Sequence, residues 1–127
     1  MIHLDTHVVA WLFAGTLERL PPTVKQRLEA EELAISPMVM LELQYLHEIG
    51  RTSETGPAVV ADLAERIGLR MAESEFSAVA ATAAGLSWTR DPFDRLIAAH
   101  SLVDDVALLT SDQTIRDHLP RAVWDSP

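Results

Sequence analysis

The chain has 127 residues, 48% of them hydrophobic and 23% charged, a balance typical of a folded globular protein and not of a disordered or fibrous one. Ten Lys and Arg against nineteen Asp and Glu give a net charge of −9, which excludes a protein that coats nucleic acid nonspecifically. The chain has no cysteine, so disulfides, thiolate metal sites and a cysteine nucleophile are also excluded.

The sequence shows neither an export signal nor a membrane span. Its first residues carry no basic group and reach an acid at Asp5, too early for the apolar core of a signal peptide. The longest nearly apolar stretch, residues 78–86, is about half of the roughly 18 residues that a membrane span needs. We therefore expect a cytoplasmic protein that does not bind membranes.

Short runs typical of β-strands alternate with stretches of helical periodicity along the chain. In chain order, we predict strands at 1–4, 33–35, 69–71, 106–109 and 122–124. The predicted helices are 6–13, 22–30, 37–49, 57–67, 73–84, 92–103 and a short one from Asp112. Prolines mark four helix starts, because the first helical turn tolerates proline: Pro22, Pro37, Pro57 and Pro92. This alternation predicts an α/β fold, a three-layer α/β/α sandwich with a mainly parallel central sheet. No repeat or linker interrupts it, so we expect one domain spanning residues 1–127.

Two predicted strands are followed by acids. Asp5 comes directly after the first strand, and Asp112 follows strand 106–109 after Thr110 and Ser111. If these strands are neighbours, both carboxylates face the crevice at the carboxyl ends of the strands, where open α/β sheets bind ligands. Taken alone, each acid is better explained as a helix cap, since Asp is a preferred N-cap residue.

Glu42 lies on the apolar side of its predicted helix. A helical wheel places it within the arc of Met38, Leu41, Tyr45, Leu46 and Ile49. Burying an unpaired carboxylate costs several kcal/mol, and no Lys or Arg stands three or four positions away. Glu42 therefore points into a site, pairs with a distant arginine or reaches the edge of the helix.

The segment Asp91-Pro92-Phe93-Asp94-Arg95 carries a further pair of acids. Helix capping by Asp91 and the helix dipole at Asp94 account for both residues. They also share one side of the helix start, so the pair can instead point along the rim of the sheet.

Five acids at element ends or apolar faces suggest a common cleft. Two carboxylates about 5 Å apart repel by roughly 3 kcal/mol at an effective dielectric near 20, so such a cleft needs positive charge. Without cysteine or clustered histidine, oxygen donors favour Mg²⁺ or Mn²⁺. An ion of this kind polarises a phosphoryl oxygen and generates hydroxide for in-line attack.

Four blocks of the sequence resemble the PIN-domain family and, within it, the VapC-type toxins of toxin–antitoxin pairs. They are residues 2–7, 36–42, 91–99 and 109–112, of which the third, DPFDRLIAA, is the most specific. The resemblance spans nearly the whole chain. It implies a metal-dependent endoribonuclease that cuts single-stranded RNA by water attack on a phosphodiester.

The resemblance assigns the metal-binding acidic cluster to Asp5, Glu42, Asp94 and Asp112. Asp91 is an added acid, and which of Asp91 and Asp94 lies closer to the metal stays open, with Asp94 preferred. The family implies that hydroxyl groups hold water or orient carboxylates, although ordinary helix capping explains each as well. These residues are Thr6, Thr110 and Ser111.

Two arginines flank the third block. Arg90 and Arg95 are placed to contact phosphate or transition-state charge, and a salt bridge to the acids is an equal alternative. We expect His7 to turn away from Asp5, because residues two positions apart on a helix do not share a face.

The family further implies an RNA substrate, a homodimer, and a cognate VapB-type antitoxin whose C-terminal segment obstructs the metal site. Two other functions stay open: a noncatalytic interaction module, and a PIN nuclease of RNA processing. A receiver-type phosphoacceptor is disfavoured, because it needs a lysine after a late strand and the chain has only Lys25.

Overall fold

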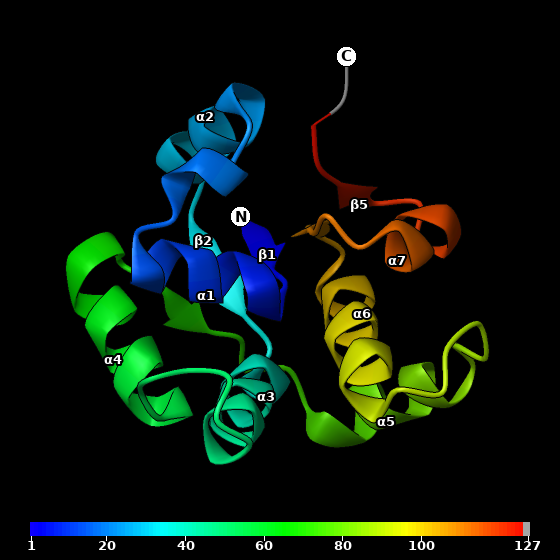
Figure 1. Ribbon diagram of the computed structural model, residues 1–127. Helices are drawn as coiled ribbons and strands as arrows, with labels where there is room; N and C mark the ends of the chain where they lie inside the picture. The colour runs from blue at the N-terminus through cyan, green and yellow to red at the C-terminus, as the bar shows by residue number, and fades with distance from the viewer. Residues whose placement is uncertain (126–127) are drawn as a thin grey trace.

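The computed structural model describes residues 1–125 and contains a sheet with the strand order β3-β2-β1-β4-β5, in which each neighbouring pair is parallel. The strands are β1 (Ile2–Leu4), β2 (Leu33–Ile35), β3 (Arg70–Met71), β4 (Ala107–Leu109) and β5 (Ala122–Val123). Figure 1 shows β1 and β2 between the surrounding helices, and β5 beside α7. The predicted α/β fold with a parallel central sheet is therefore confirmed.

The helices begin close to the predicted positions. They are α1 (Thr6–Ala14), the short 3-10 helix η1 (Leu17–Arg19), α2 (Pro22–Ala30), α3 (Pro37–Glu48), α4 (Gly56–Ile67), α5 (Phe76–Ala84), α6 (Pro92–Asp104) and α7 (Gln113–His118). The sequence did not predict η1. Helix α5 begins three residues later than predicted, because the Ala72 N–H donates to the Ile35 carbonyl and keeps this segment beside the sheet.

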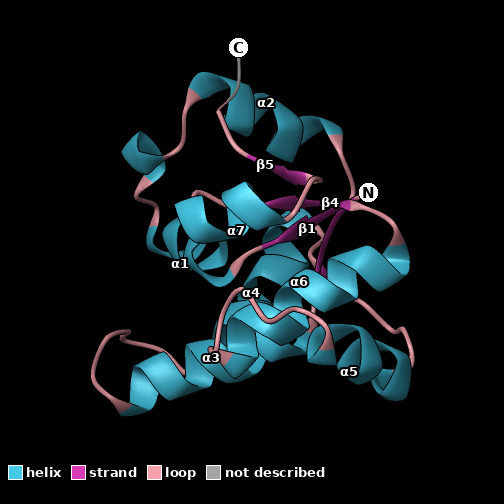
Figure 2. Cartoon of the chain, turned by 90° about the vertical axis from the view of Figure 1, so that its right-hand side faces the viewer, coloured by secondary structure: helices cyan, strands magenta, loops and turns pink. Residues whose placement is uncertain are grey.

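The strand order determines how the helices are layered. From β1 the chain moves through β2 to β3 at one edge, and then crosses to β4 and β5 on the other side of β1. Because crossovers between parallel strands are right-handed, this reversal places helices on both faces of the sheet. Figure 2 shows α3, α5 and α6 gathered on one side of the strands, consistent with the contacts of α6 with α3 and α5.

The core is built on the central strands, whose residues are all buried in β1, β2 and β4. Helix α3 packs on this core through Val39 and Leu43, which are at most 1% exposed. The predicted apolar face of this helix is wrong, because Leu41, Tyr45 and Ile49 are about half exposed. Helix α3 therefore has two apolar stripes. The stripe with Val39 and Leu43 faces the core, and the stripe that lies beside Glu42 on the helical wheel does not.

Among residues 1–125, no helix combines the length and the apolar character that crossing a membrane requires.

Candidate functional site

The candidate site lies at the carboxyl ends of β1 and β4. The two strands are neighbours, with Leu4 opposite Leu109, and the Asp5 N–H donates to the Leu109 carbonyl at 3.0 Å. Because β1 and β4 are neighbours, Asp5 and Asp112 follow adjacent strand ends, as their placement in one crevice requires. The chain reverses its direction across the sheet between these two strands, and such switch points are where open α/β sheets bind ligands.

The Asp5 carboxylate is buried and held from two sides. Its Oδ1 accepts the Thr6 N–H at 2.8 Å, and its Oδ2 accepts the Thr110 hydroxyl at 2.6 Å. Asp5 is 4% exposed and belongs to the cap of α1, so the capping role also holds. One carboxylate thus both begins a helix and has a fixed orientation at the strand ends.

Asp112 is held in a turn beside Asp5. Its Oδ1 accepts the Ile115 N–H at 3.1 Å and caps α7, while its own N–H donates to the Thr110 hydroxyl at 3.1 Å. The Thr110 side chain therefore connects the two acids, since the same hydroxyl donates to Asp5. Capping fixes Asp112 and still leaves its second carboxylate oxygen available.

The expectation that His7 turns away from Asp5 is wrong. The His7 Nδ1 lies 3.4 Å from the Asp5 Oδ2, and its Nε2 accepts the Ser111 N–H at 3.0 Å. The helical spacing argument fails because Asp5 is outside the helix, with an extended backbone at φ −74° and ψ 160°. His7 is the residue at this site that the sequence analysis missed.

Glu42 reaches the site from α3. The Thr6 hydroxyl donates a hydrogen bond to its carboxylate, and no arginine or lysine of residues 1–125 forms an ion pair with it. Burial raises the pKa of Glu42; the Thr6 hydrogen bond opposes that rise, and the charges of Asp5 and Asp91 add to it. Its partner is thus a hydroxyl group, and not the distant arginine considered above.

The pKa of Asp94 responds to the charges of the other predicted acids. Burial, followed by the charges of Asp91, Asp5, Asp112 and Glu42, raises the pKa of Asp94 to about 7. Asp91 is exposed and caps α6, its Oδ1 accepting two N–H groups of the first turn at 2.8 and 3.4 Å. The other four predicted acids are therefore near enough to act on the half-buried carboxyl group of Asp94.

The two flanking arginines do not neutralise this cluster. The Arg90 guanidinium donates to the Ser87 carbonyl at 2.9 Å, and that of Arg95 donates to the Thr89 carbonyl at 2.8 Å. Neither forms an ion pair with an acid within residues 1–125, so the salt bridge considered as an alternative is not present there.

The chemistry of the acids fits a hard divalent cation. Carboxylate oxygens are the donors that Mg²⁺ and Mn²⁺ prefer, and burial together with the charges of neighbouring acids raises the pKa of both Asp94 and Glu42. In the described part of the chain, no three histidine, aspartate or glutamate side chains are already arranged to hold an ion together. The residue types fit a metal, although their arrangement is not that of a formed site.

A comparison with known families finds that the profile described as PIN domain matches residues 2–118. The chain belongs to the PIN-domain family. A curated relative, Ribonuclease VapC22 of Mycobacterium tuberculosis, is 34% identical over 95% of this chain and 96% of its own length. This similarity places the chain with the VapC proteins of the family, as the four sequence blocks predicted.

Solved structures with the same PIN fold come from toxin–antitoxin complexes. The chain is similar to one from Klebsiella pneumoniae, with a TM-score of 0.68 and 19% identity over 97% of this chain and 96% of that one. It is also similar to VapBC2 from Rickettsia felis, bound to a DNA fragment of its promoter, with a TM-score of 0.66 and 19% identity over 98% and 100% of the two chains. At these identities the likeness establishes the fold alone.

Proposed function

We propose that this PIN-domain protein is an endoribonuclease toxin that cuts single-stranded RNA with Mg²⁺ or Mn²⁺ and is neutralised by a cognate VapB-type antitoxin. The observation that carries this proposal is the gathering of acids near the switch point of the sheet, where burial and the charges of four other acids raise the pKa of Asp94. It is supported by the similarity to a protein named a ribonuclease over nearly the whole chain. RNA as substrate also implies action in the cytoplasm.

In the proposed reaction, Asp5, Asp94 and Asp112 would hold the metal, directly or through water, with Glu42 completing the catalytic acids and Asp91 beside them. When bound, the ion supplies polarisation of the scissile phosphate and a more acidic water. Among Asp91 and Asp94, Asp94 is the better ligand. Asp94 is half-buried and faces the charges of the other acids, whereas Asp91 is exposed and bonded to backbone N–H groups.

Neighbouring hydroxyl groups keep the acids in place. Thr110 donates to Asp5, and Thr6 donates to Glu42, so neither carboxylate can rotate freely when substrate arrives. A carboxylate oriented by a second residue loses less freedom on binding a metal or a water. Ser111 belongs to the same turn, where its N–H and hydroxyl face His7.

Local positive charge has to attract RNA to a protein of net charge −9. Arg90 and Arg95 are suited to this role, since both flank the acids and neither is engaged in an ion pair within residues 1–125. Their guanidinium groups can contact the phosphates on either side of the scissile bond. Selection among RNAs then depends on this local patch and on the accessibility of unpaired strands.

A homodimer is part of the proposal. The outer stripe of α3 exposes Leu41, Tyr45 and Ile49, each about half accessible, and the Tyr45 ring lies 6.0 Å from that of Phe93. An apolar stripe of this kind is the surface that a second copy of the chain would cover. Sedimentation of the purified chain, compared with Tyr45→Glu, tests this surface directly.

The test of the activity uses the purified chain, freed of any antitoxin and incubated with total RNA and Mg²⁺ or Mn²⁺. Cut ends are mapped by sequencing in parallel reactions with EDTA, with Asp94→Asn, and with Asp62→Asn as a matched surface control on α4. We expect discrete cuts that EDTA and Asp94→Asn abolish and Asp62→Asn retains. The absence of cuts from the folded protein would contradict the nuclease and favour a noncatalytic interaction module.

A further inference from the structure

The imidazole of His7 lies between two chain segments that both carry site acids. On one side its Nδ1 is 3.4 Å from the Asp5 Oδ2, after β1. On the other side its Nε2 is 3.0 Å from the Ser111 N and 2.9 Å from the Ser111 Oγ, after β4. Trp11 packs edge-on against the ring, with centroids 4.8 Å apart. The ring is thereby held in one place by contacts on three sides.

These contacts determine which nitrogen of His7 carries the proton. A backbone N–H can only donate, so the Nε2 that faces the Ser111 N–H must be the unprotonated nitrogen. The neutral ring then has its proton on Nδ1, which points toward the Asp5 carboxylate.

We propose that His7 is a positioning residue that fixes Asp5 and the turn from Ser111 to Asp112 relative to each other, through the 3.4 Å contact of its Nδ1 with the Asp5 carboxylate and as an acceptor for the Ser111 N–H. The expected effect of His7 on metal binding rests on the proposed function. The His7 side chain acts through Asp5 and Ser111, and it does not itself contact RNA. We call the two contacts of the His7 ring, to Asp5 and to Ser111, the clamp. It acts beside the Thr110 hydroxyl, which connects Asp5 and Asp112 at the end of β4.

A side-chain connection between Asp5 and Asp112 matters because the two acids follow strands that are far apart in the sequence. Asp5 begins α1 and Asp112 begins α7, so each acid moves with its own helix unless side chains connect them. Partners that orient metal ligands typically affect metal affinity or activity by about 10–100-fold when they are removed. We expect an effect of this size at His7.

Three substitutions separate the two halves of the clamp. His7→Leu removes both polar contacts and keeps an apolar group against Trp11. In His7→Asn the amide nitrogen stands as many bonds from Cβ as Nδ1 does, so it retains a donor toward Asp5. In His7→Gln the amide group stands as many bonds from Cβ as Nε2 does, so its oxygen retains an acceptor for the Ser111 N–H. His118→Gln is the matched control, since that exposed ring hydrogen-bonds the Thr114 carbonyl of its own helix and stacks on Trp88, away from Asp5 and Ser111.

The first measurement needs no metal. In ¹⁵N NMR of the wild-type chain, we expect His7 to carry its proton on Nδ1, and the Ser111 amide to exchange slowly with solvent. The amide should stay protected in His7→Gln and His118→Gln and lose protection in His7→Leu and His7→Asn. A proton on Nε2, or a Ser111 amide that exchanges equally in the wild type and His7→Leu, would overturn the clamp.

The second measurement is Mn²⁺ affinity by titration calorimetry. We expect His7→Leu to bind Mn²⁺ about 10–100-fold more weakly than the wild type, His7→Asn to recover part of that loss, and His118→Gln to bind normally. Wild-type affinity in His7→Leu would overturn the positioning role. If His7→Leu fails to fold, the same comparison is made between His7→Asn and His7→Gln, where only the first keeps the contact to Asp5.

The two proposals fail in different ways. A wild-type chain that neither binds Mn²⁺ nor cuts RNA contradicts the proposed function, while the metal-free measurements still decide whether His7 connects Asp5 to the Ser111 turn. An active wild type whose His7 proton lies on Nε2 keeps the function and removes the clamp.

Discussion

The Thr110 hydroxyl donates a 2.6 Å hydrogen bond to the Asp5 carboxylate, joining residues 105 positions apart in the sequence. Thr110 is fully buried, and the same hydroxyl accepts the Asp112 N–H at 3.1 Å. One small side chain therefore sets the distance between two of the four acids to which we assign catalysis.

Replacing Thr110 by Val removes this connection while preserving the shape of the side chain. We expect metal affinity or cleavage to fall by about 10–100-fold, because Asp5 loses the group that orients it. The free energy of unfolding should fall by about 1–3 kcal/mol, because the buried Asp5 oxygen loses its hydrogen-bond donor. Cleavage rates and urea denaturation check both effects, with Thr114→Val on the exposed face of α7 as the control. A variant with wild-type cleavage would show that Asp5 needs no such partner.

The raised pKa of Asp94 predicts a pH dependence of stability in the metal-free protein. The folded chain holds this proton up to about pH 7, whereas the ordinary value is 3.8, so the folded state binds more protons between the two. The stabilising contribution is therefore fully present below 3.8 and is lost as the pH rises toward 7. In EDTA, Asp94→Asn should gain stability relative to the wild type across this range.

The difference between the two proteins is the quantity to measure, because buried histidines act in the opposite direction. Burial lowers the pKa of His3 and His100, so their contribution is lost as the pH falls below about 6.5. Urea denaturation of the wild type and Asp94→Asn between pH 4 and 8 cancels these shared terms. Parallel stability curves would show that neither burial nor the other acids raise the pKa of Asp94.

Local signals in the sequence were sufficient for most of the secondary structure, although not for η1 or the start of α5. Pro22, Pro37 and Pro92 begin helices where predicted, since proline in a first turn depends only on the neighbouring residues. Strand β2 spans the predicted residues 33–35. The adjacency of β1 and β4 could only be stated as a condition, because the order of the whole sheet decides which distant strands pair.

The side-chain arrangement of the site was less accessible from the sequence. A helical wheel of α3 shows two apolar stripes, and only packing decides that Leu43 is 1% exposed and Leu41 is 51% exposed. His7 was misjudged because helical spacing does not apply to a capping residue such as Asp5. The functional roles of the acids stay predictions, and cleavage assays have to test them.

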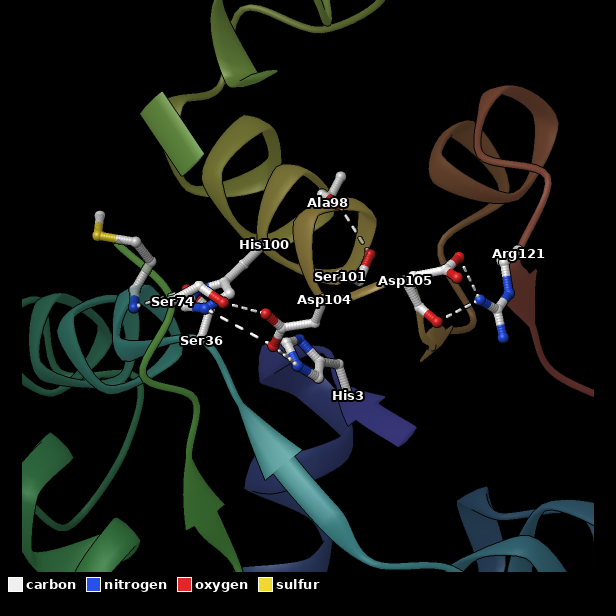
Figure 3. A network of polar contacts seen from close by, with 10 residues as sticks. His3, Ser36, Ser74, Ala98, His100, Ser101, Asp104, Asp105 and Arg121 are labelled. Carbon is white, nitrogen blue, oxygen red and sulfur yellow. Dashed lines mark hydrogen bonds and ion pairs between the residues drawn. The ribbon is translucent and has the colours of Figure 1, made fainter. Parts of the chain in front are cut away.

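A second polar cluster, around Asp104 at the far end of α6, predicts an effect on stability without one on cleavage (Figure 3). The Asp104 Oδ2 lies 2.8 Å from the His3 Nε2, and its Oδ1 accepts the Ser74 hydroxyl. Asp104→Asn offers only one acceptor oxygen, so one donor is left without a partner at a cost of about 1–3 kcal/mol. Cleavage should persist, because ten residues of helix, about 15 Å, separate Asp104 from Asp94.

The neighbouring Asp105 supplies the control for that substitution. It is exposed, pairs with Arg121 at 2.9 Å and has a φ of 55°, a left-handed conformation that Asn also tolerates. Asp105→Asn should therefore change the free energy of unfolding by about 0–1 kcal/mol. Equal unfolding midpoints for the two variants would mean that the Asp104 cluster contributes nothing to the fold.

The close approach of α4 to α3 at Gly56 predicts a strong effect of a single methyl group. A Cβ on Gly56 would meet the Met40 carbonyl at less than contact distance and the Gln44 N at 2.8 Å, both of them backbone atoms that cannot move aside. We expect Gly56→Ala to lower the free energy of unfolding by about 1–3 kcal/mol through overpacking. Gly85→Ala is the matched control, since its Cβ would meet only the Thr82 carbonyl, at 3.5 Å, and should be neutral or stabilising by up to about 1 kcal/mol. Urea denaturation of both variants decides the matter, and equal stabilities would show that α4 shifts away from α3 without cost.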